Sequence, residues 1–233
     1  SRFIVGAIGL TVIGILTRSL GPAGYGYYNL IFAYLFIFST VADLGLYTIL
    51  VREISKVDSG EERTIASKIF TLRLIAAVLV LIAADLLVFA FPYPLLVKLG
   101  VLIASLFSIY SSLTQVLTGI FQKHLCLYLV SFADIISRAS QLALLIILVY
   151  LKAGLLLFVG AVVISEIVHF FLTLLFSRSL TRVGISVDFK YWGEILKIAL
   201  PVAASLVFIL IYFKLDTILL SLMKPAYDVG VYS

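Results

Sequence analysis

Charged residues are scarce in this chain of 233 residues: they make up 12% of the sequence, whereas a soluble domain has about 25%. Long apolar runs without any charge take their place, for example residues 99–122 and 198–213. Runs of about 20 residues allow a helix to cross a bilayer core of about 30 Å. Strands of a transmembrane barrel would alternate in polarity instead, and no such alternation occurs. The sequence therefore predicts an all-α fold, a polytopic transmembrane helix bundle in a cell membrane.

Cysteine is nearly absent as well, because Cys126 is the single one, and this excludes an internal disulfide. The sequence shows no metal-ligand spacing, since His124 and His169 lie far apart. It has no glycine-rich phosphate loop and no pattern typical of a catalytic triad. We therefore expect no metal, no cofactor and no enzyme activity. The net charge of +5 is interpreted as an excess of basic residues in loops on one side of the membrane, and no nucleic-acid partner is expected.

The apolar runs predict seven membrane spans joined by short connections, none of which is long enough to fold as a domain. Because the apolar pattern repeats along the whole chain, a secretory signal peptide is not expected. The chain begins and ends close to apolar runs, so we expect a segment of a longer protein, cut at both ends. The predicted spans cover residues 3–17, 29–52, 67–91, 95–121, 127–151, 154–177 and 194–222.

The distribution of lysine and arginine near the span ends predicts that the N-terminus is cytoplasmic, because cytoplasmic loops carry the larger share of these residues. In this orientation the larger group lies in the cytoplasm: Arg2, Arg52, Lys56, Arg63, Lys68, Lys123, Arg178, Arg182 and Lys190. The smaller group lies outside: Arg18, Lys98, Lys152 and Lys224. His124, in a short cytoplasmic connection, is interpreted as a solvated side chain.

The charged residues that remain inside the spans are the candidates for function. A charge at the middle of a bilayer costs about 2.5–3.5 kcal/mol on insertion scales, and such residues usually face the bundle interior or a wet cavity. The cations are Arg73, Arg138 and Lys214, and the acids are Asp43, Asp85, Asp134, Glu166 and Asp216.

The fifth predicted span is the most informative. Ser131, Asp134, Arg138 and Gln141 are spaced by three, four and three residues, so they share one face of a helix. Asp134 and Arg138, four residues apart, can form an ion pair. One interpretation is a purely structural pair that holds helices together. The other is a cation that lines a substrate cavity and is kept in place by Asp134.

Two other spans carry polar faces that are open to both structural and functional interpretations. Glu166 and His169 share one face of the sixth span, where they could carry a proton or bind a cation, or form a buried structural pair. Asp43, in the second span, could bind a cation or cap a kink next to Gly45. In the fourth span, small and polar residues indicate tight helix packing: Ser105, Ser108, Ser112, Gln115 and Gly119.

Several segments resemble the polysaccharide flippases of the Wzx type. The most specific are residues 17–28, with the order Thr-Arg-Ser-Leu-Gly-Pro-Ala-Gly-Tyr-Gly-Tyr-Tyr, and residues 42–46, continuing to residues 51–54. Residues 72–74, 200–201 and 212–217 are similar to the family's third and seventh spans. In the first segment, Gly21-Pro22 predicts a sharp turn, and Gly24 and Gly26 would allow unusual backbone angles there. The family often has arginine where this chain has Lys214.

The resemblance implies a fold related to multidrug exporters, with a first lobe of six helices. Residues 1–179 would form that lobe, residues 180–193 a cytoplasmic connection between lobes, and residues 194–233 the start of the second lobe. The implied function is translocation of a lipid-linked oligosaccharide by alternating access. An exporter of small cationic drugs from the same superfamily, coupled to a cation, is the first alternative, and a membrane-embedded glycan enzyme the second.

On the flippase interpretation, the site residues divide into two sets. Arg138 and Arg73 are expected to contact the anionic headgroup, because a guanidinium can hydrogen-bond to two phosphate oxygens at once, and Asp134 and Gln141 would line the same substrate site. Asp43 and Glu166 are expected to take up a coupling ion, either sodium or a proton. The expected partners are the lipid-linked oligosaccharide, membrane lipid and this ion.

Overall fold

The computed structural model describes residues 2–43 and 45–201, and in these ranges the regular secondary structure is helical throughout. This confirms the all-α prediction. A further helix covers residues 189–201. The labelled elements are α1 (Arg2–Asp43), α2 (Leu46–Ile54), α3 (Ser59–Leu87), the 3₁₀ turn η1 (Val88–Ala90), α4 (Leu95–Lys123), α5 (Leu127–Tyr150) and α6 (Leu155–Ser177).

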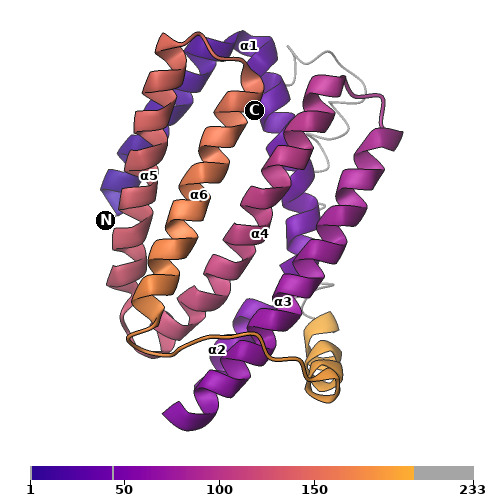
Figure 1. The fold of residues 1–233 in the computed structure, drawn as a ribbon, viewed down its shortest axis with the longest axis vertical. Helices are drawn as coiled ribbons and strands as arrows, with labels where there is room; N and C mark the ends of the chain where they lie inside the picture. Colours follow the sequence, from indigo (N-terminus) through magenta and orange to yellow (C-terminus); the bar gives the residue numbers. More distant parts are fainter. Residues whose placement is uncertain (1, 44, 202–233) are drawn as a thin grey trace.

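Helix α1 is bent back on itself at Gly21, so that its two arms run side by side in opposite directions (Figure 1). A straight helix of its 42 residues would be about 63 Å long, about twice the bilayer core. Gly21 has φ 67° and ψ 176°, a conformation that glycine adopts at little cost, and Pro22 follows in the first turn of the second arm. The predicted turn at Gly21-Pro22 is confirmed. The prediction for Gly24 and Gly26 was wrong, because both are helical and neither has a positive φ.

A second break separates α1 from α2. Gly45 has φ 68° and ψ 12°, the left-handed conformation, directly before the first residue of α2. The sequence suggested a kink beside Gly45 within one span over residues 29–52. The structure divides that span into the second arm of α1 and the short helix α2, because a left-handed residue cannot continue a right-handed helix.

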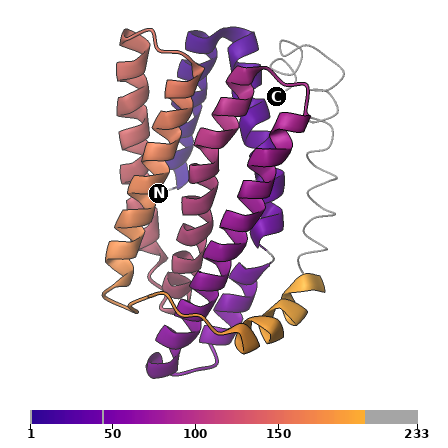
Figure 2. The same cartoon turned by 45° about the vertical axis from the view of Figure 1, so that its right-hand side comes forward.

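The helices pack as a bundle in which α4 lies at the centre (Figures 1 and 2) and contacts α1, α2, α3 and α6. Two glycines of α4 allow close approach. A methyl group added at Gly100 would lie 2.3 Å from Ile31 Cδ1, and one at Gly119 would lie 2.9 Å from Leu50 Cδ2. The serines 105, 108 and 112 on the same helix are also buried. The prediction of tight packing along this helix is confirmed.

The outward faces of the bundle are apolar, as expected for contact with lipid. Large exposed side chains include Leu79, Leu86, Leu106, Leu157 and Phe171. Five helical segments of the described residues are long and apolar enough to cross a membrane, and one of them runs from Ile8 to Ile54 and joins both arms of α1 with α2. The two arms correspond to the first two predicted spans. Of the seventh, only residues 194–201 lie within the described residues, where they are helical.

We name the two ends of the bundle by residues that lie there. The Gly21 end carries the bend of α1, and the Glu62 end carries the start of α3 and the end of α4. The chain leaves α6 at the Glu62 end of the bundle. It then runs across this end as an extended connection. The connection leads into the helix at residues 189–201, beside the first turns of α3 (Figure 2). Successive spans thus run in opposite directions, and connections between helices lie at both ends of the bundle.

Candidate functional site

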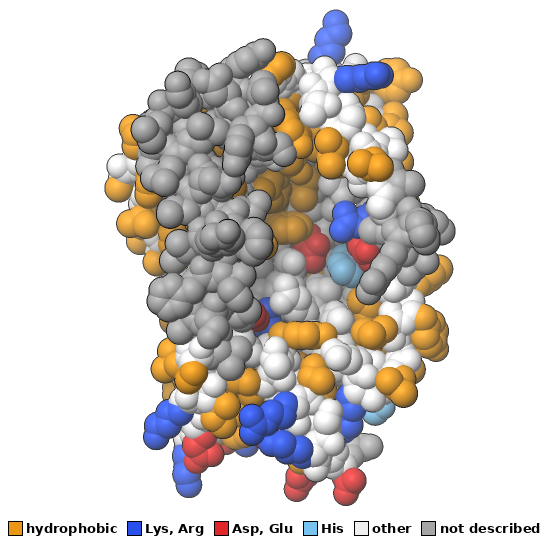
Figure 3. Space-filling view, turned by 180° about the vertical axis from the view of Figure 1, so that it is seen from behind, with side chains coloured by type: hydrophobic (Ala, Val, Ile, Leu, Met, Phe, Trp, Pro, Cys, Tyr) orange, Lys and Arg blue, Asp and Glu red, His pale blue; other side chains and the backbone are white. Residues whose placement is uncertain are grey.

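A polar cavity of about 760 Å³ lies between the two arms of α1 and helices α4, α5 and α6. Figure 3 shows this face as a hollow, with acidic, basic and histidine side chains gathered between apolar surfaces above and below. The cavity contains the whole predicted face of α5 together with the polar pair of α6 and polar side chains of α4. Its polar lining includes Ser131, Asp134, Arg138, Gln141, Glu166, His169, Ser111, Thr114, Gln115 and Thr118.

Arg138 is the cation of this cavity. Its Nε donates a hydrogen bond of 3.0 Å to Asp134 Oδ1, one helical turn earlier. The predicted ion pair is therefore confirmed. The side chain of Arg138 is 42% exposed and lines the cavity. Among the described residues its Nη atoms have no hydrogen-bond or ion-pair partner. Asp134 orients the side chain of Arg138 and leaves its other nitrogens uncovered. An arginine must have such uncovered nitrogens in order to bind an anion.

Glu166 and His169 of α6 face the same cavity. Glu166 Oε1 lies 3.6 Å from His169 Nδ1, and the two side chains are only 14% and 15% exposed. His169 Nε2 is buried and has no hydrogen-bond partner among the described residues. A buried imidazole nitrogen beside a carboxylate can accept or release a proton. The pair is therefore suited to carrying a proton or a small cation.

Part of the cavity lining is aromatic. Tyr28 and Phe32 of α1 pack with their ring centroids 4.8 Å apart, and Phe32 meets Phe107 of α4 edge to face at 5.6 Å. This aromatic lining was not predicted from the sequence. The signal was present in the tyrosines that follow Gly21 in the segment of residues 17–28. One cavity thus combines charged groups on α5 and α6 with flat apolar surfaces on α1 and α4.

Arg73 lies behind the cavity and does not line it. Its side chain is 1% exposed and its Nη2 lies 2.5 Å from Asp43 Oδ1. Asp43 Oδ1 has no hydrogen-bond partner among the described residues, so the pair is described as an ion pair. Arg73 also donates hydrogen bonds of 2.7 Å to Ser112 Oγ and to Gln115 Oε1. Since Gln115 lines the cavity, Arg73 connects the end of α1 to the cavity wall.

Comparison with known proteins identifies the family of the chain. The family model described as "Polysaccharide biosynthesis protein" matches residues 1–233. The chain belongs to the polysaccharide biosynthesis protein family. No curated protein and no solved structure matched the chain.

The site residues of this polysaccharide biosynthesis protein fall into two groups in space. Arg138, Asp134, Gln141 and Glu166 share the cavity, although the sequence analysis assigned Glu166 to a separate role. Arg73 and Asp43 form their own buried pair. Lys214 and Asp216 lie outside the described residues. Within the part of the chain that the structure describes, no group of three His, Cys, Asp or Glu side chains could hold a metal ion.

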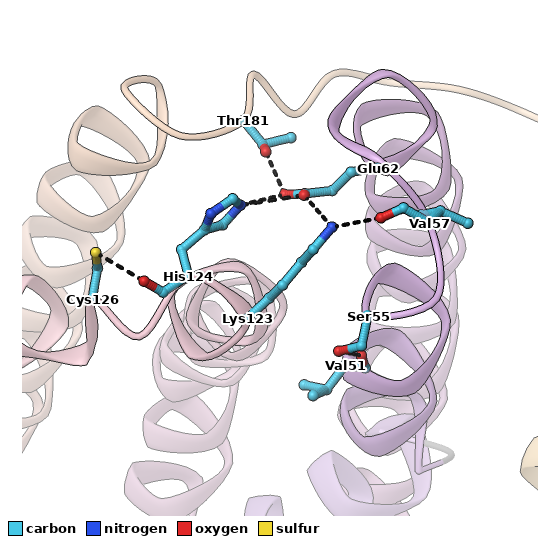
Figure 4. Close-up of polar contacts among 8 residues, drawn as sticks. All are labelled: Val51, Ser55, Val57, Glu62, Lys123, His124, Cys126 and Thr181. Carbon is cyan, nitrogen blue, oxygen red and sulfur yellow. Dashed lines mark hydrogen bonds and ion pairs between the residues drawn. The ribbon is translucent and has the colours of Figure 1, made fainter.

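A second polar cluster lies at the Glu62 end of this family member and was not predicted (Figure 4). Glu62 is fully buried, and its carboxylate accepts hydrogen bonds from Lys123 Nζ at 2.6 Å and from the hydroxyl of Thr181. His124 Nε2 lies 3.0 Å from the same carboxylate. The interpretation of His124 as a solvated side chain was therefore wrong. The cluster joins the start of α3, the end of α4 and the connection after α6.

The connection after α6 continues along α3 through further polar contacts. The amides of Gly184 and Ser186 donate hydrogen bonds of 3.0 and 2.8 Å to Ser67 Oγ and Thr71 Oγ1. Lys68 Nζ lies 2.7 Å from Asp188 Oδ2. The hydrogen bond from Lys68 lowers the pKa of the Asp188 carboxyl, and the backbone amide of Tyr191 adds to this effect. These contacts fasten the connection to α3.

Proposed function

We propose that this protein is a flippase that moves a lipid-linked oligosaccharide across the membrane for polysaccharide synthesis. The observation that carries the proposal is the cavity, where the half-exposed side chain of Arg138 lies between largely apolar helices. The chain also belongs to a family described by its role in polysaccharide biosynthesis. Placing a charged guanidinium inside a membrane span costs free energy, and ionisable residues in such positions usually mark a substrate or ion pathway. The oxygens of a diphosphate headgroup would fit Arg138, because a guanidinium can donate two parallel hydrogen bonds to them.

The two walls of the cavity fit the two parts of such a headgroup. Arg138 would bind the phosphates, with Gln141 and Gln115 as additional polar contacts. The aromatic rings of Tyr28, Phe32 and Phe107 would pack against the flat faces of sugar rings. The lipid tail would remain in the bilayer, since the outer surface of the helices is apolar. Arg73 would act on this site through Gln115 in the conformation seen here, and the prediction that it binds the headgroup directly stays open to test.

Transport would proceed by alternating access, with the six-helix lobe formed by residues 1–179 rocking against a second lobe that begins after the connection at residues 180–193. Glu166 is our candidate for taking up the coupling ion, sodium or a proton, because His169 beside it has an unsatisfied nitrogen. Asp43 is the second candidate. It could take up a cation only by loosening its ion pair with Arg73.

The proposed orientation has the Glu62 end in the cytoplasm and can be tested by cysteine labelling. Ser59 and Ser179 lie at the Glu62 end and Ala153 at the Gly21 end. In a Cys126→Ser background, cysteines at positions 59 and 179 should react only with reagents that enter the cytoplasm, and a cysteine at position 153 only from outside. Labelling of positions 59 and 153 from the same side would refute the proposed topology.

The function is tested with the purified full-length protein in vesicles that contain a fluorescent lipid-linked oligosaccharide. We expect the labelled headgroup to become inaccessible to a reagent outside the vesicle at a rate that depends on the protein. Movement of small organic cations without movement of the oligosaccharide lipid would instead identify a cation exporter. Conversion of the lipid into a new glycan product would identify an enzyme.

A further inference from the structure

A second, smaller cavity lies at the Gly21 end of the bundle. It has a volume of about 350 Å³ and shares no residue with the polar cavity described above. Its walls come from the first arm of α1, the end of α5, the connection to α6 and the start of α6. Two cations line it together with apolar and small side chains: Arg18, Lys152, Ser19, Leu148, Val149 and Phe158.

The two cations lack the partners that several other basic residues of this part of the chain have. Neither Arg18 nor Lys152 forms an ion pair or a side-chain hydrogen bond within residues 2–43 and 45–201. By contrast, Lys98 at the same end donates a hydrogen bond to the carbonyl of Phe89 at 3.3 Å and lies 5.6 Å from the centre of its ring. At the Glu62 end, Lys123 and Lys68 each have a carboxylate within 2.7 Å. Figure 3 shows basic side chains alone at the rim of the Gly21 end, and both signs mixed at the opposite end.

The positions of both cations are fixed by the backbone. Arg18 lies on the last turn of helix before the bend at Gly21. Lys152 has φ 50°, and its amide donates a hydrogen bond of 3.0 Å to the carbonyl of Val149, while the next amide donates to Leu148 at the same distance. The inner wall is Phe158, which is fully buried and packs with Leu16 and Leu145. Both cationic side chains are exposed. Two like charges therefore line one cavity, and an anion bound between them would relieve their repulsion.

We propose that this cavity binds the phosphate group of an anionic membrane phospholipid. Arg18 would hydrogen-bond to two phosphate oxygens and Lys152 would add a second positive charge. Leu148 and Val149 would contact the upper part of an acyl chain. The cavity lies where α1, α5 and α6 reach the end of their spans, at the depth of lipid headgroups. The apolar wall beside the cations favours a lipid over a free phosphate ion. This proposal does not depend on the substrate of the larger cavity.

The test measures lipid retained by the full-length protein, purified in detergent, when phosphatidylglycerol or phosphatidylcholine is added. Bound lipid is counted by native mass spectrometry. Wild-type protein should retain phosphatidylglycerol and not phosphatidylcholine. Neutralising one cation, in Arg18→Gln or Lys152→Gln, should weaken retention about fivefold, and the double substitution about 25-fold. Lys98→Gln removes the same charge from the same end of the bundle and should change nothing.

Three outcomes would overturn the proposal. The first is equal retention of phosphatidylglycerol by the wild type and the double variant. The second is equal retention of both lipids by the wild type. The third is displacement of the lipid by millimolar inorganic phosphate, which would make the site one for free anions. Melting temperature is recorded for each variant, and the single variants decide the question if the double variant does not fold.

Discussion

Replacing Asp134 and Arg138 together by alanine should give a protein that inserts and folds normally but no longer flips lipid-linked oligosaccharide. The double change removes both partners of an ion pair, so no unpaired charge is left in the cavity. It also removes the cation that we assign to the headgroup phosphates. A hydrogen bond to a charged group contributes about 1.5–3 kcal/mol, which corresponds to about a 10- to 150-fold loss of transport.

The single and double variants separate a structural pair from a substrate site. If the pair only holds α5 in place, Arg138→Ala alone should be the worst variant, because it leaves Asp134 unpaired, and the double variant should recover. If Arg138 binds substrate, transport should remain lost in the double variant while expression and melting temperature return to normal. Full transport by the double variant would show that Arg138 is no substrate ligand.

Two further variants sharpen this test. Arg138→Lys keeps the charge but cannot donate two parallel hydrogen bonds to a phosphate, so we expect transport well below that of the wild type. Arg182→Ala removes an arginine of the connection after α6, outside the cavity, and serves as the matched control. The measurement is the initial rate of headgroup translocation in vesicles, divided by the amount of folded protein in the membrane.

Arg73→Met should destabilise the lobe by about 3–5 kcal/mol, because it leaves the carboxylate of Asp43 without its counter-charge in the interior. It would also remove the donors to Ser112 and Gln115. The double variant Asp43→Asn, Arg73→Met should recover most of this loss, since no charge remains unpaired. The free energy of unfolding is measured in detergent with increasing sodium dodecyl sulfate.

The control is Arg52→Met, which breaks an ion pair with Glu53 in which the arginine side chain is 57% exposed. We expect a change of less than about 1 kcal/mol there. Equal stability of Arg73→Met and the wild type would contradict the structural role that its burial indicates. A double variant as unstable as the single one would show that the hydrogen bonds of Arg73, and not its charge, hold the helices together.

The same variants test the coupling residues. The stable Asp43→Asn, Arg73→Met protein should still respond to an ion gradient if Glu166 takes up the coupling ion. Glu166→Gln should then transport at a rate that no longer depends on the gradient. The reverse pattern would assign coupling to Asp43. Gradient dependence retained in both variants would leave Glu166 and Asp43 with structural roles only.

Features that depend on neighbouring residues could be predicted from the sequence. Hydrophobic runs determined the spans, because a helix must satisfy its backbone hydrogen bonds within itself wherever lipid surrounds it. Gly21-Pro22 determined the bend of α1. The face of α5 with Asp134 and Arg138, and the pair that they form, followed from helical periodicity alone.

Features that join distant parts of the chain were decided by the tertiary structure. Periodicity defines the faces of a helix but not which helix each face meets. The sequence therefore could not predict that Arg73 pairs with Asp43, that Glu62 gathers Lys123, His124 and Thr181, or that Glu166 shares a cavity with Arg138. Charges on separate spans come within reach of one another only when neighbouring helices are fixed in distance and rotation, and that is decided by packing between helices, as at Gly100 and Gly119 of α4.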